Sequence, residues 1–556
     1  MRRAVESVGG TVDDAPEGKI VEGIEVVALE VIEDRDPAPR FLNALHATTR
    51  AKTIRRESLL RVGTRYRREL VDETVRDLQT FQQVSLVLGV ALRGSSPDRV
   101  RVLYVTKDTW SLRTQADLRL GSGGLDLLTI EPIERNIGGS FDAVTGRFVL
   151  DPETITLGGG LYIPRFAGEH VYSSNEANII LNRDTGHAEG TTGGVAVFTP
   201  LVSADTPWVW QQQARWQDQY VRRYVDAKLT DFEGVPDAYH ARSFTESAAI
   251  VRSFGHDHKA DVMLGAEANV RAYVGLDPNV VDARIVRDYA AARVPTSDTR
   301  VAPYVQLRFY ENRFVRLHDV ALLGLFEDYR VGYDVSVRAY PVTRAAGSSR
   351  DFVGVDAFAQ YVLPIADGYA RASTNMLLEA TTRDVPTAFY AANVALVSPR
   401  FFAGRIVLDA LALARPNDYP NLRSVLGGDT RLRGYPSGAF LGENLVVYNA
   451  ELRSRPLEIF ACELGGAAFF DVGDAFDGRD LRAKSSAGVG LRAMFPQIDR
   501  RTWRFDVAVP MVRAGGAGPV AFYLAFEQAF PTTIVTPPSA FPTQSFLNPT
   551  GGALGQ

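Results

Sequence analysis

The stretch that decides the fold is GGDTRLRGYPSGAFLGEN, residues 427–444. Its five glycines and its Tyr-Pro pair are typical of a loop rather than of a helix or a strand. Arg431 and Arg433 lie in the middle of this glycine-rich segment. The question that the stretch raises is which group an arginine in such a loop binds.

The composition limits the classes of protein to which the chain can belong. The chain has 556 residues, enough for one large unit and a smaller one, and its 61 Lys and Arg nearly balance 66 Asp and Glu. This balance argues against nucleic acid as a partner. The 29 Phe, 21 Tyr and 48 Gly favour a β-rich structure, and Cys462, the one cysteine, has no partner for a disulfide. The longest apolar runs, such as LVLGVAL at 86–92, are much shorter than the roughly 18 residues of a membrane helix.

The N-terminal part differs in texture from the rest. Residues 1–18 contain acidic residues and no apolar core, so we expect a disordered lead and no secretion signal. Residues 19–112 predict a strand (19–32), two helices (50–60 and 67–81) and two strands (84–92 and 98–108). Such an order indicates a small α+β module with a three-stranded sheet. Its edge strand either binds an extended partner by strand addition or belongs to a structural spacer that binds no partner.

From about residue 113 the chain reads as short alternating strands. In EANVRAYVG (267–275) Glu267, Asn269 and Arg271 share one face, and aliphatic residues share the other. YDVSVRAY (333–340) repeats the pattern. Alternation alone does not separate a membrane barrel from a soluble sandwich. Length favours the barrel, because the 416 positions of 115–530 would give sixteen strands of roughly 26 residues each, turns included.

Two strands follow the arginine loop. NLVVYNAELRSRP (444–456) places Asn449, Glu451 and Arg453 on one face, and GGAAFFDVGDAFDG (465–478) places Phe469 and Asp471 together. The loop and these strands resemble the superfamily of BamA- and TamA-type outer-membrane assembly factors, two-partner secretion transporters and organellar import barrels. In that family an Arg-Gly-Tyr or Arg-Gly-Phe loop tip folds back into the barrel, and a Phe-x-Asp-x-Gly strand receives it.

The resemblance implies a role for each matching residue. Arg433, Gly434 and Tyr435 fall on the loop tip, and Phe469, Asp471 and Gly473 fall on the receiving strand. We therefore expect Arg433 to pair with Asp471 and Tyr435 to pack near Phe469. The alternate apolar residues Phe522, Leu524, Phe526 and Phe530 match the family's last strand. Residues 19–112 are similar to a POTRA domain, and the resemblance covers residues 19 to 530.

The expected organisation is mostly β: a disordered lead (1–18), one POTRA-like domain (19–112), a transmembrane antiparallel barrel of about 16 strands (113–530) and a disordered tail (531–556). Members of the family usually carry several POTRA domains, whereas this chain has room for one. This departure favours a specialised role over the central housekeeping one. In the family both barrel termini face the periplasm, so we expect the tail there.

The resemblance implies a barrel that assists insertion or translocation of other proteins at the bacterial outer membrane. Its partners would be outer-membrane lipid, unfolded β-barrel or secreted clients, and accessory periplasmic proteins or lipoproteins. Alternatives are a polypeptide-secretion channel or passive pore of the same fold, and, in another class, a surface adhesin or structural barrel.

We expect no enzyme, no cofactor and no metal. GHDH (255–258) holds two histidines two residues apart, but the sequence identifies no third ligand. Walker, HExxH and GxSxG motifs are absent from the sequence.

Overall fold

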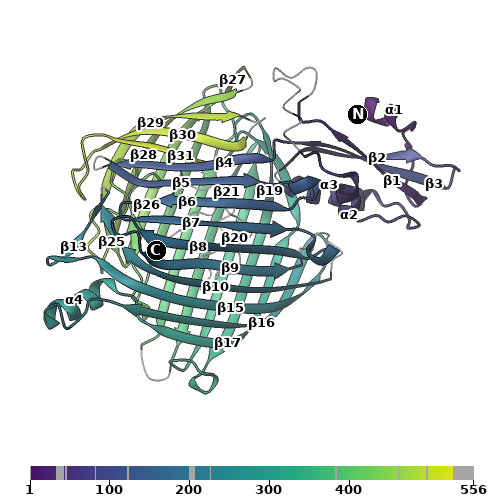
Figure 1. The fold of residues 1–556 in the computed structure, drawn as a ribbon. Coiled ribbons are helices and arrows are strands. Elements are labelled where there is room, and N and C mark those ends of the chain that lie inside the picture. Colours follow the sequence, from purple (N-terminus) through teal and green to yellow (C-terminus); the bar gives the residue numbers. More distant parts are fainter. Residues whose placement is uncertain are drawn as a thin grey trace.

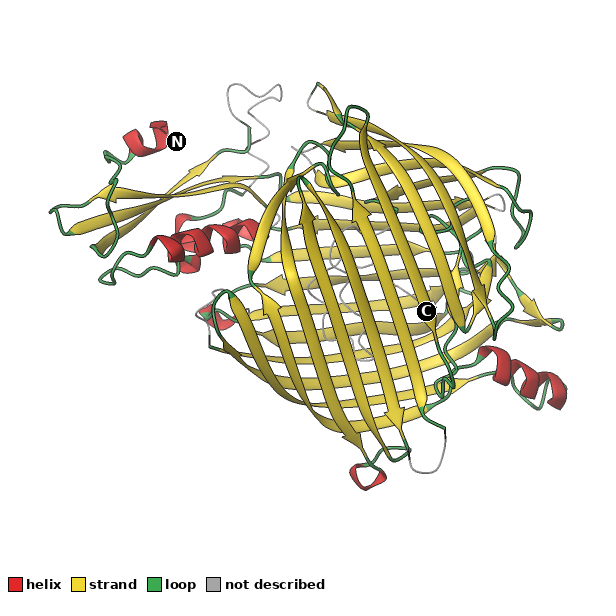
Figure 2. Ribbon diagram, turned by 180° about the vertical axis from the view of Figure 1, so that it is seen from behind, coloured by secondary structure: helices red, strands yellow, loops and turns green. Residues whose placement is uncertain are grey.

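The computed structural model describes residues 2–32, 43, 47–81, 83–121, 124–199, 207–225, 227–381, 385–460, 462–495 and 499–529. A closed β-barrel forms most of the molecule, and a small α+β domain lies beside one end of it (Figures 1 and 2). We call that end of the barrel the proximal end and the opposite end, where helix α4 (Ala283–Arg293) lies, the distal end.

The small domain contains one three-stranded sheet and two helices. Strand β1 (Ile20–Leu29) is parallel to β3 (Arg99–Asp108), and β2 (Val84–Arg93) is antiparallel to it, in the spatial order β1-β3-β2. Helices α2 (Ala51–Glu57) and α3 (Arg68–Thr80) pack on the sheet through Ile54, Leu78 and Tyr104, all with no exposed surface. The chain order of these elements is the order that the alternation and helical periodicity predicted.

The first residues correct the expectation of a disordered lead. Helix α1 (Arg2–Ser7) buries Ala4 and Val5 against Leu92 and Leu103 of the sheet. Next, the Arg93 N–H donates to the Thr11 carbonyl at 2.8 Å, and the Asp13 N–H donates to the Ala91 carbonyl at 3.0 Å. Local composition missed this because the apolar contacts of α1 lie on β2 and β3, far along the chain. The segment 2–13 covers the outer edge of β2, so β1 is the edge strand of this sheet that is open to a further strand.

The barrel is one antiparallel sheet that closes on itself. Its strands are β4 (Leu112–Gly121), β5 (Gly124–Glu134), β6 (Ala143–Leu150), β7 (Thr154–Ile163), β8 (Tyr172–Asn182), β9 (Ala188–Phe198), β10 (Trp208–Arg222), β15 (Ala238–Phe254), β16 (His258–Val274), β17 (Asp298–Glu311), β18 (Arg313–His318), β19 (Phe326–Val342), β20 (Phe352–Ile365), β21 (Gly368–Ala380), β22 (Thr387–Val397), β23 (Gly404–Ala414), β26 (Asn444–Ser454), β27 (Leu457–Ile459), β28 (Cys462–Phe476), β29 (Lys484–Phe495), β30 (Asp499–Pro510) and β31 (Ala521–Phe526). Short pairs β11–β12 (Tyr224–Val225, Lys228–Leu229), β13–β14 (Asp231–Phe232, Val235–Pro236) and β24–β25 (Ser424–Leu426, Phe440–Gly442) lie in distal loops.

The strand number corrects the estimate of about 16. The closed barrel has 22 strands in the described part of the chain. Strand β18 continues β17 along β19, and β27 continues β26 along β28, so the chain passes between the two ends of the barrel 20 times. The estimate assumed a long loop at every second connection. Several distal connections are instead tight turns, such as residues 151–153 between β6 and β7 and 183–187 between β8 and β9, so each crossing uses less chain.

The exposed fractions of the side chains show which face of each strand points into the barrel. On β16 Glu267 and Asn269 are 4% exposed, whereas the neighbouring Val270 is 43% exposed and Leu264 53%. Polar residues therefore line the inside and aliphatic residues cover the outside, which is the reverse of a soluble sandwich. The fold class predicted from the sequence, a transmembrane antiparallel barrel with a small α+β domain, is confirmed. Among the described residues the longest helix, α3, has 13 residues, and no helix is long and apolar enough to cross a membrane.

The outward-facing side of β16 predicts how a charged substitution there changes barrel stability. Leu264→Arg places a guanidinium near the middle of that strand on the apolar face, so we expect barrel stability to fall by about 2–4 kcal/mol. Gln306→Glu is the matched control, because Gln306 faces inward and accepts a hydrogen bond from Arg338 Nε at 3.1 Å. Unfolding of the purified proteins in lipid vesicles measures both. Equal stability of Leu264→Arg and wild type would contradict the assigned orientation.

Candidate functional site

The candidate site is the loop tip that reaches into the barrel between β23 and β26. The β24–β25 pair forms its base, and Leu432, Arg433 and Tyr435 have no exposed surface. Their contacts are inward-facing residues of β26, β28, β30 and β31. The segment is therefore a lumen loop, which we define as residues 427–439.

Arg433 is the centre of the lumen loop. Its Nε and Nη2 donate to the two carboxylate oxygens of Asp471 at 2.8 and 3.0 Å, and its backbone N–H donates to Asp471 Oδ2 at 3.2 Å. Nη1 donates to Glu451 at 2.9 Å and to Asp506 at 3.2 Å. The contact between Arg433 and Asp471 that we expected is present, and it is bidentate, the geometry that a planar guanidinium favours.

Phe469 corrects one detail of the expected packing. Its ring lies under the Arg433 guanidinium, with 3.4 Å from Cζ to the ring centroid. Tyr435 packs instead against Phe440, with ring centroids 5.2 Å apart, and its hydroxyl lies 2.9 Å from the carbonyl oxygens of Ser485 and Val512. The guanidinium occupies the face of Phe469 because it gains both dispersion and the attraction of a cation to the ring there.

Two glycines, one in the loop and one in its receiving strand, allow close approach to neighbouring strands. Gly434 has φ +95°, a left-handed conformation that other residues adopt only with strain, and its N–H donates to the Tyr523 hydroxyl at 2.9 Å. Gly473 of β28 lies against β26, where an added Cβ would come within 2.7 Å of the Val446 carbonyl oxygen. A side chain at either position would push the contacting backbone segments apart.

The charges around the loop balance. Five carboxylates and five arginines lie buried around the loop. Four of each form one ion-pair network: Asp429, Glu451, Asp471 and Asp506 with Arg433, Arg453, Arg492 and Arg504. Arg431 and Asp409 form a further pair, which Asn449 joins to the network through the Arg431 carbonyl and Asp471. The Asp506 carboxylate forms ion pairs with three arginines, Arg433, Arg492 and Arg504, at distances of up to 3.2 Å. Because each buried charge faces an opposite one, the network avoids the cost of an isolated ion in the barrel interior.

Several members of this network were missed from the sequence. Arg492, Arg504, Asp506 and Tyr523 were not predicted as site residues, although each occupies an inward position of an alternating strand. The two-residue period could have identified their face. It could not have identified their partners, because these depend on the register between β28, β29, β30 and β31.

The barrel closes at a weak seam. Among the described residues, strands β31 and β4 share a single registered pair, Leu524 with Leu118, whereas β31 shares six with β30 and β4 shares ten with β5. Phe522 and Leu524 face outward, and Phe526 packs on Trp503 with ring centroids 4.7 Å apart.

The last strand ends earlier than predicted. It stops at Phe526 because Glu527 adopts φ +65° and donates its N–H to the Thr502 carbonyl at 2.7 Å. Ala529 then lies among inward-facing residues such as Val331 and Val407, with 1% of its surface exposed. The chain thus turns inward at this point. Phe530 and the tail 531–556 lie outside the described residues, so the expected position of the tail stays a prediction.

The small domain and the barrel share one apolar core. Phe81 of the domain stacks on Phe141 of the β5–β6 turn, with ring centroids 4.5 Å apart, and Tyr172 at the start of β8 packs on Phe81. Thr53 donates to the Gly139 carbonyl at 2.7 Å. The domain therefore sits on the turns that follow the first barrel strands.

A charged cluster borders this shared core. Arg165 of the β7–β8 turn donates to both oxygens of Glu57, at 2.7 and 3.0 Å, and His170 Nε2 lies 3.4 Å from the same carboxylate. Burial, and then the charge of Glu57, raise the pKa of Asp77 to about 7. Burial raises the pKa of Glu57 and lowers the pKa of His170 to about 4.

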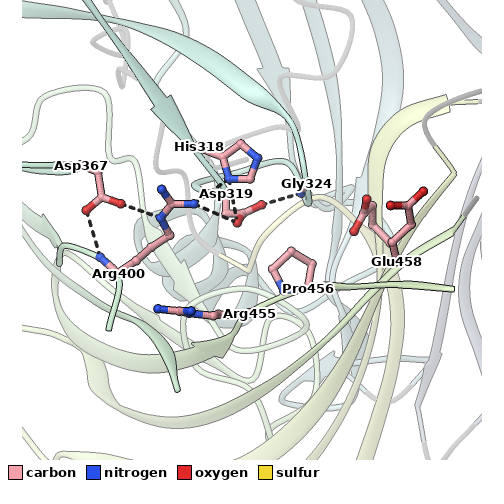
Figure 3. A pocket seen from close by; sticks show the side chains of 9 residues that line it. His318, Asp319, Gly324, Asp367, Arg400, Arg455, Pro456 and Glu458 are labelled. Atoms are coloured by element: carbon pink, nitrogen blue, oxygen red, sulfur yellow. Dashed lines mark hydrogen bonds and ion pairs between the residues drawn. The ribbon is translucent and has the colours of Figure 1, made fainter. Parts of the chain in front are cut away.

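A cavity lies at the proximal end, among the turns that join β18 to β19, β20 to β21, β22 to β23 and β26 to β28 (Figure 3). It measures about 680 Å³, and four carboxylates and two arginines line it together with His318. Arg400 binds Asp367 at 2.6 Å and His318 Nδ1 at 2.9 Å. With four carboxylates against two arginines, the cavity presents a net acidic lining.

The two histidines of GHDH separate in the structure. His258 stacks on Tyr333, with its Nδ1 3.2 Å from the phenolic oxygen, whereas His256 points to helix α3 of the small domain. They do not form a pair of ligands.

The similarities to known proteins are to solved structures, at low identity. No family model matches it, and no curated protein matches its sequence. Its structure is similar to BamA from Haemophilus ducreyi lacking POTRA domains 1–3, at 12% identity and a TM-score of 0.38, over 91% of this chain and 83% of that one. CdiB from Acinetobacter baumannii (10%, TM-score 0.43, 92% and 73%) and CdiB from Escherichia coli (11%, 0.44, 94% and 80%) are also similar. At these identities the likeness concerns the fold alone.

The first prediction from the site concerns Arg433. Arg433→Ala leaves three carboxylates without one of their partners, so we expect a loss of roughly 3–5 kcal/mol in barrel stability and a lumen loop open to protease. Asp471→Ala should have a similar effect, and the double variant should be little worse than either. Thermal unfolding and protease mapping of residues 427–444 measure these effects.

Arg423→Ala is the matched control for this experiment. It removes an arginine of the same connection, but the partners of Arg423, Asp477 and Glu443, are exposed. The loss there should stay below about 1 kcal/mol. Additive effects of Arg433→Ala and Asp471→Ala would show that the two side chains act separately.

The second prediction concerns pH. The folded-state pKa of Asp77, about 7, lies above its ordinary 3.8, so the docked domain holds a proton that the separated domain releases. Through Asp77, docking should therefore be tightest at low pH, weaken as the pH rises from about 3.8 to about 7, and level off above that. His170 stays neutral above about pH 4. Hydrogen bonds to Asp257 and Glu69 raise the pKa of His256 above its ordinary 6.5, so His256 also loses charge as the pH rises, and the loss weakens its contact with helix α3.

Hydrogen–deuterium exchange of residues 68–80 at about pH 5.5 and about pH 8, corrected for intrinsic exchange, measures this change. Asp77→Asn should reduce the pH dependence while keeping the domain docked, and Asp77→Asn with His256→Ala should reduce it further. An unchanged pH dependence in Asp77→Asn would assign the effect to another group.

Proposed function

We propose that this protein is a bacterial outer-membrane barrel that assists the insertion or translocation of other proteins, with the β4–β31 seam as the site where a client strand pairs. The observation that carries the proposal is the single registered pair between these strands, Leu118 with Leu524. All other neighbouring pairs of full-length barrel strands share at least five registered pairs.

A weak seam suits this function for a physical reason. A backbone N–H or C=O left unpaired in hydrocarbon costs several kcal/mol, so a strand enters lipid only with a partner. Strand β4 keeps ten registered pairs with β5, and its other edge pairs with β31 at one position. That edge offers backbone groups to an incoming strand, which can then enter the membrane without passing through an unpaired state.

The small domain supports the same reading. The Ile24 carbonyl accepts Arg55 Nε at 3.0 Å, so it points away from β3 toward the free edge of β1. Beside this edge lies a groove of about 460 Å³, lined by Ile24, Leu60, Val62 and the arginines Arg55, Arg56 and Arg61. An extended client could add to β1 by strand pairing, and the arginines favour one with acidic residues. This is the role that the resemblance to a POTRA domain implies.

The mechanism requires no enzyme chemistry and no cofactor. Strand pairing exchanges one set of backbone hydrogen bonds for another, and burial of the client's apolar face in lipid drives the reaction. The partners are lipid, unfolded barrel or secreted clients, and accessory periplasmic proteins. In this orientation the small domain and the proximal end face the periplasm.

A polypeptide-secretion channel is the second candidate, and the lumen itself bears on it. The lumen loop and the seven charged strand residues around it fill part of the barrel interior. An exporter would have to move this loop, whereas an insertase that uses the seam would not. A passive pore meets the same obstacle, and a structural barrel or adhesin gives no reason for a weak seam.

A disulfide across the seam tests the proposal. In a Cys462→Ala background, Leu118→Cys with Leu524→Cys joins the registered residues. We expect the oxidised protein to stay folded and to lose assembly of a client barrel in liposomes, and the reduced protein to regain it. The matched control is Val507→Cys with Phe522→Cys, which joins β30 to β31, strands that already share six pairs.

Two results would reject the seam mechanism. Full client assembly by the oxidised seam variant would show that the seam need not open. Equal loss in the Val507–Phe522 control would show that the disulfide acts on the barrel in general. Export of a secreted client that survives seam closure but fails when the lumen loop is fixed would favour the channel.

A further inference from the structure

Helix α3 presents an acidic face to the barrel. Glu69, Glu73 and Asp77 follow each other at four-residue intervals, so they lie on one side of the helix. The first two meet the β15–β16 turn, which carries His256, and Asp77 meets the β7–β8 turn, which carries His170. At two places, therefore, a histidine of a barrel turn meets two carboxylates of the small domain.

The two clusters differ in how their negative charge is balanced. In the group of Glu57, Asp77 and His170, Arg165 binds both oxygens of Glu57 at 2.7 and 3.0 Å, so a cation is already built in. In the group of Glu69, Glu73 and His256, Arg67 Nη2 donates to one oxygen of Glu69, Oε2, at 3.0 Å. Glu69 Oε1 turns the other way, toward His256 Nε2.

The geometry of the second group is that of a ligand set. One ligand atom each from Glu69, Glu73 and His256 lies within 4.8 Å of the other two, and Glu73 is only 7% exposed. His256 Nδ1 lies 3.0 Å from Asp257 Oδ1, which fixes the ring and directs Nε2 to the carboxylates. A carboxylate behind a ligating imidazole is the usual arrangement around protein-bound zinc.

We propose that Glu69, Glu73 and His256 bind a divalent transition-metal ion of the zinc class and that this ion ties the small domain to the barrel. Two carboxylates at i and i+4 of a helix project to one side, as metal ligands on helices do, and the imidazole supplies the third ligand. The nitrogen ligand favours zinc over magnesium, which prefers oxygen ligands alone.

The ion would connect parts of the chain that are far apart in sequence. Glu69 and Glu73 belong to the small domain, and His256 belongs to the turn between two barrel strands. Docking through the shared core and the Glu57–Arg165 pair fixes the domain at the turns after β5 and β7. A metal at His256 adds an attachment on the β15–β16 turn, so it would restrict rotation of the domain about the first attachment.

Zinc binding to the full chain in detergent micelles tests the proposal. We expect one tightly bound zinc ion per chain by metal analysis after dialysis. Affinity should fall at least tenfold in His256→Ala and in Glu73→Gln, and by about 10–100-fold in Asp257→Asn. His256 is half exposed, so its replacement is compatible with folding. Zinc should also slow amide exchange in residues 68–80 of wild type and not of His256→Ala.

Two controls make the outcome decisive. His258→Ala removes the neighbouring histidine of the same turn, which contacts Tyr333, and should bind zinc as wild type does. His170→Ala removes the histidine of the arginine-filled cluster and should also bind normally. Wild-type affinity in His256→Ala, loss in His170→Ala instead, or no zinc retained by wild type would each overturn the proposal.

Discussion

The bidentate contact between Arg433 and Asp471 is the interaction on which the C-terminal half of the barrel depends. Through the same guanidinium the lumen loop reaches β26 at Glu451 and β30 at Asp506. Its next two residues reach β31, because Tyr523 accepts the Gly434 N–H and donates to the Tyr435 carbonyl, both at 2.9 Å. One short loop thus holds the last strands from inside, including the strand that has a single registered pair on its other side.

The composition of the network follows from its surroundings. A single arginine against a single aspartate would leave other inward acids of β26 and β30 uncompensated, and each would cost several kcal/mol when buried. Five arginines and five carboxylates remove that cost together. Such a network adds little net stability compared with an apolar core, but it discriminates strongly against displaced positions of the loop, since every displacement leaves several charges unpaired.

Sequence patterns predicted what depends on local periods and missed what depends on register. The two-residue period assigned Asn449, Glu451 and Asp471 to the inside, and the resemblance added the loop arginine. The packing of Phe469 on Arg433 instead of on Tyr435 depends on the depth of the loop in the barrel, which no local pattern carries. The strand number failed for a similar reason, because turn lengths vary freely between strands. Helix α1 was missed because its apolar partners lie on β2 and β3.

The two sides of the seam are held by different parts of the molecule. The small domain rests on the turns after β5 and β7, so its docking positions the first strands, including β4. The lumen loop holds β26, β28, β30 and β31. One registered pair joins these two groups across β4 and β31 in the described part of the chain, so the seam is the strand pair whose backbone resists separation least. Contacts of the small domain, such as Glu57 with Arg165, lie on the β4 side of this seam, and the contacts of the lumen loop lie on the β31 side.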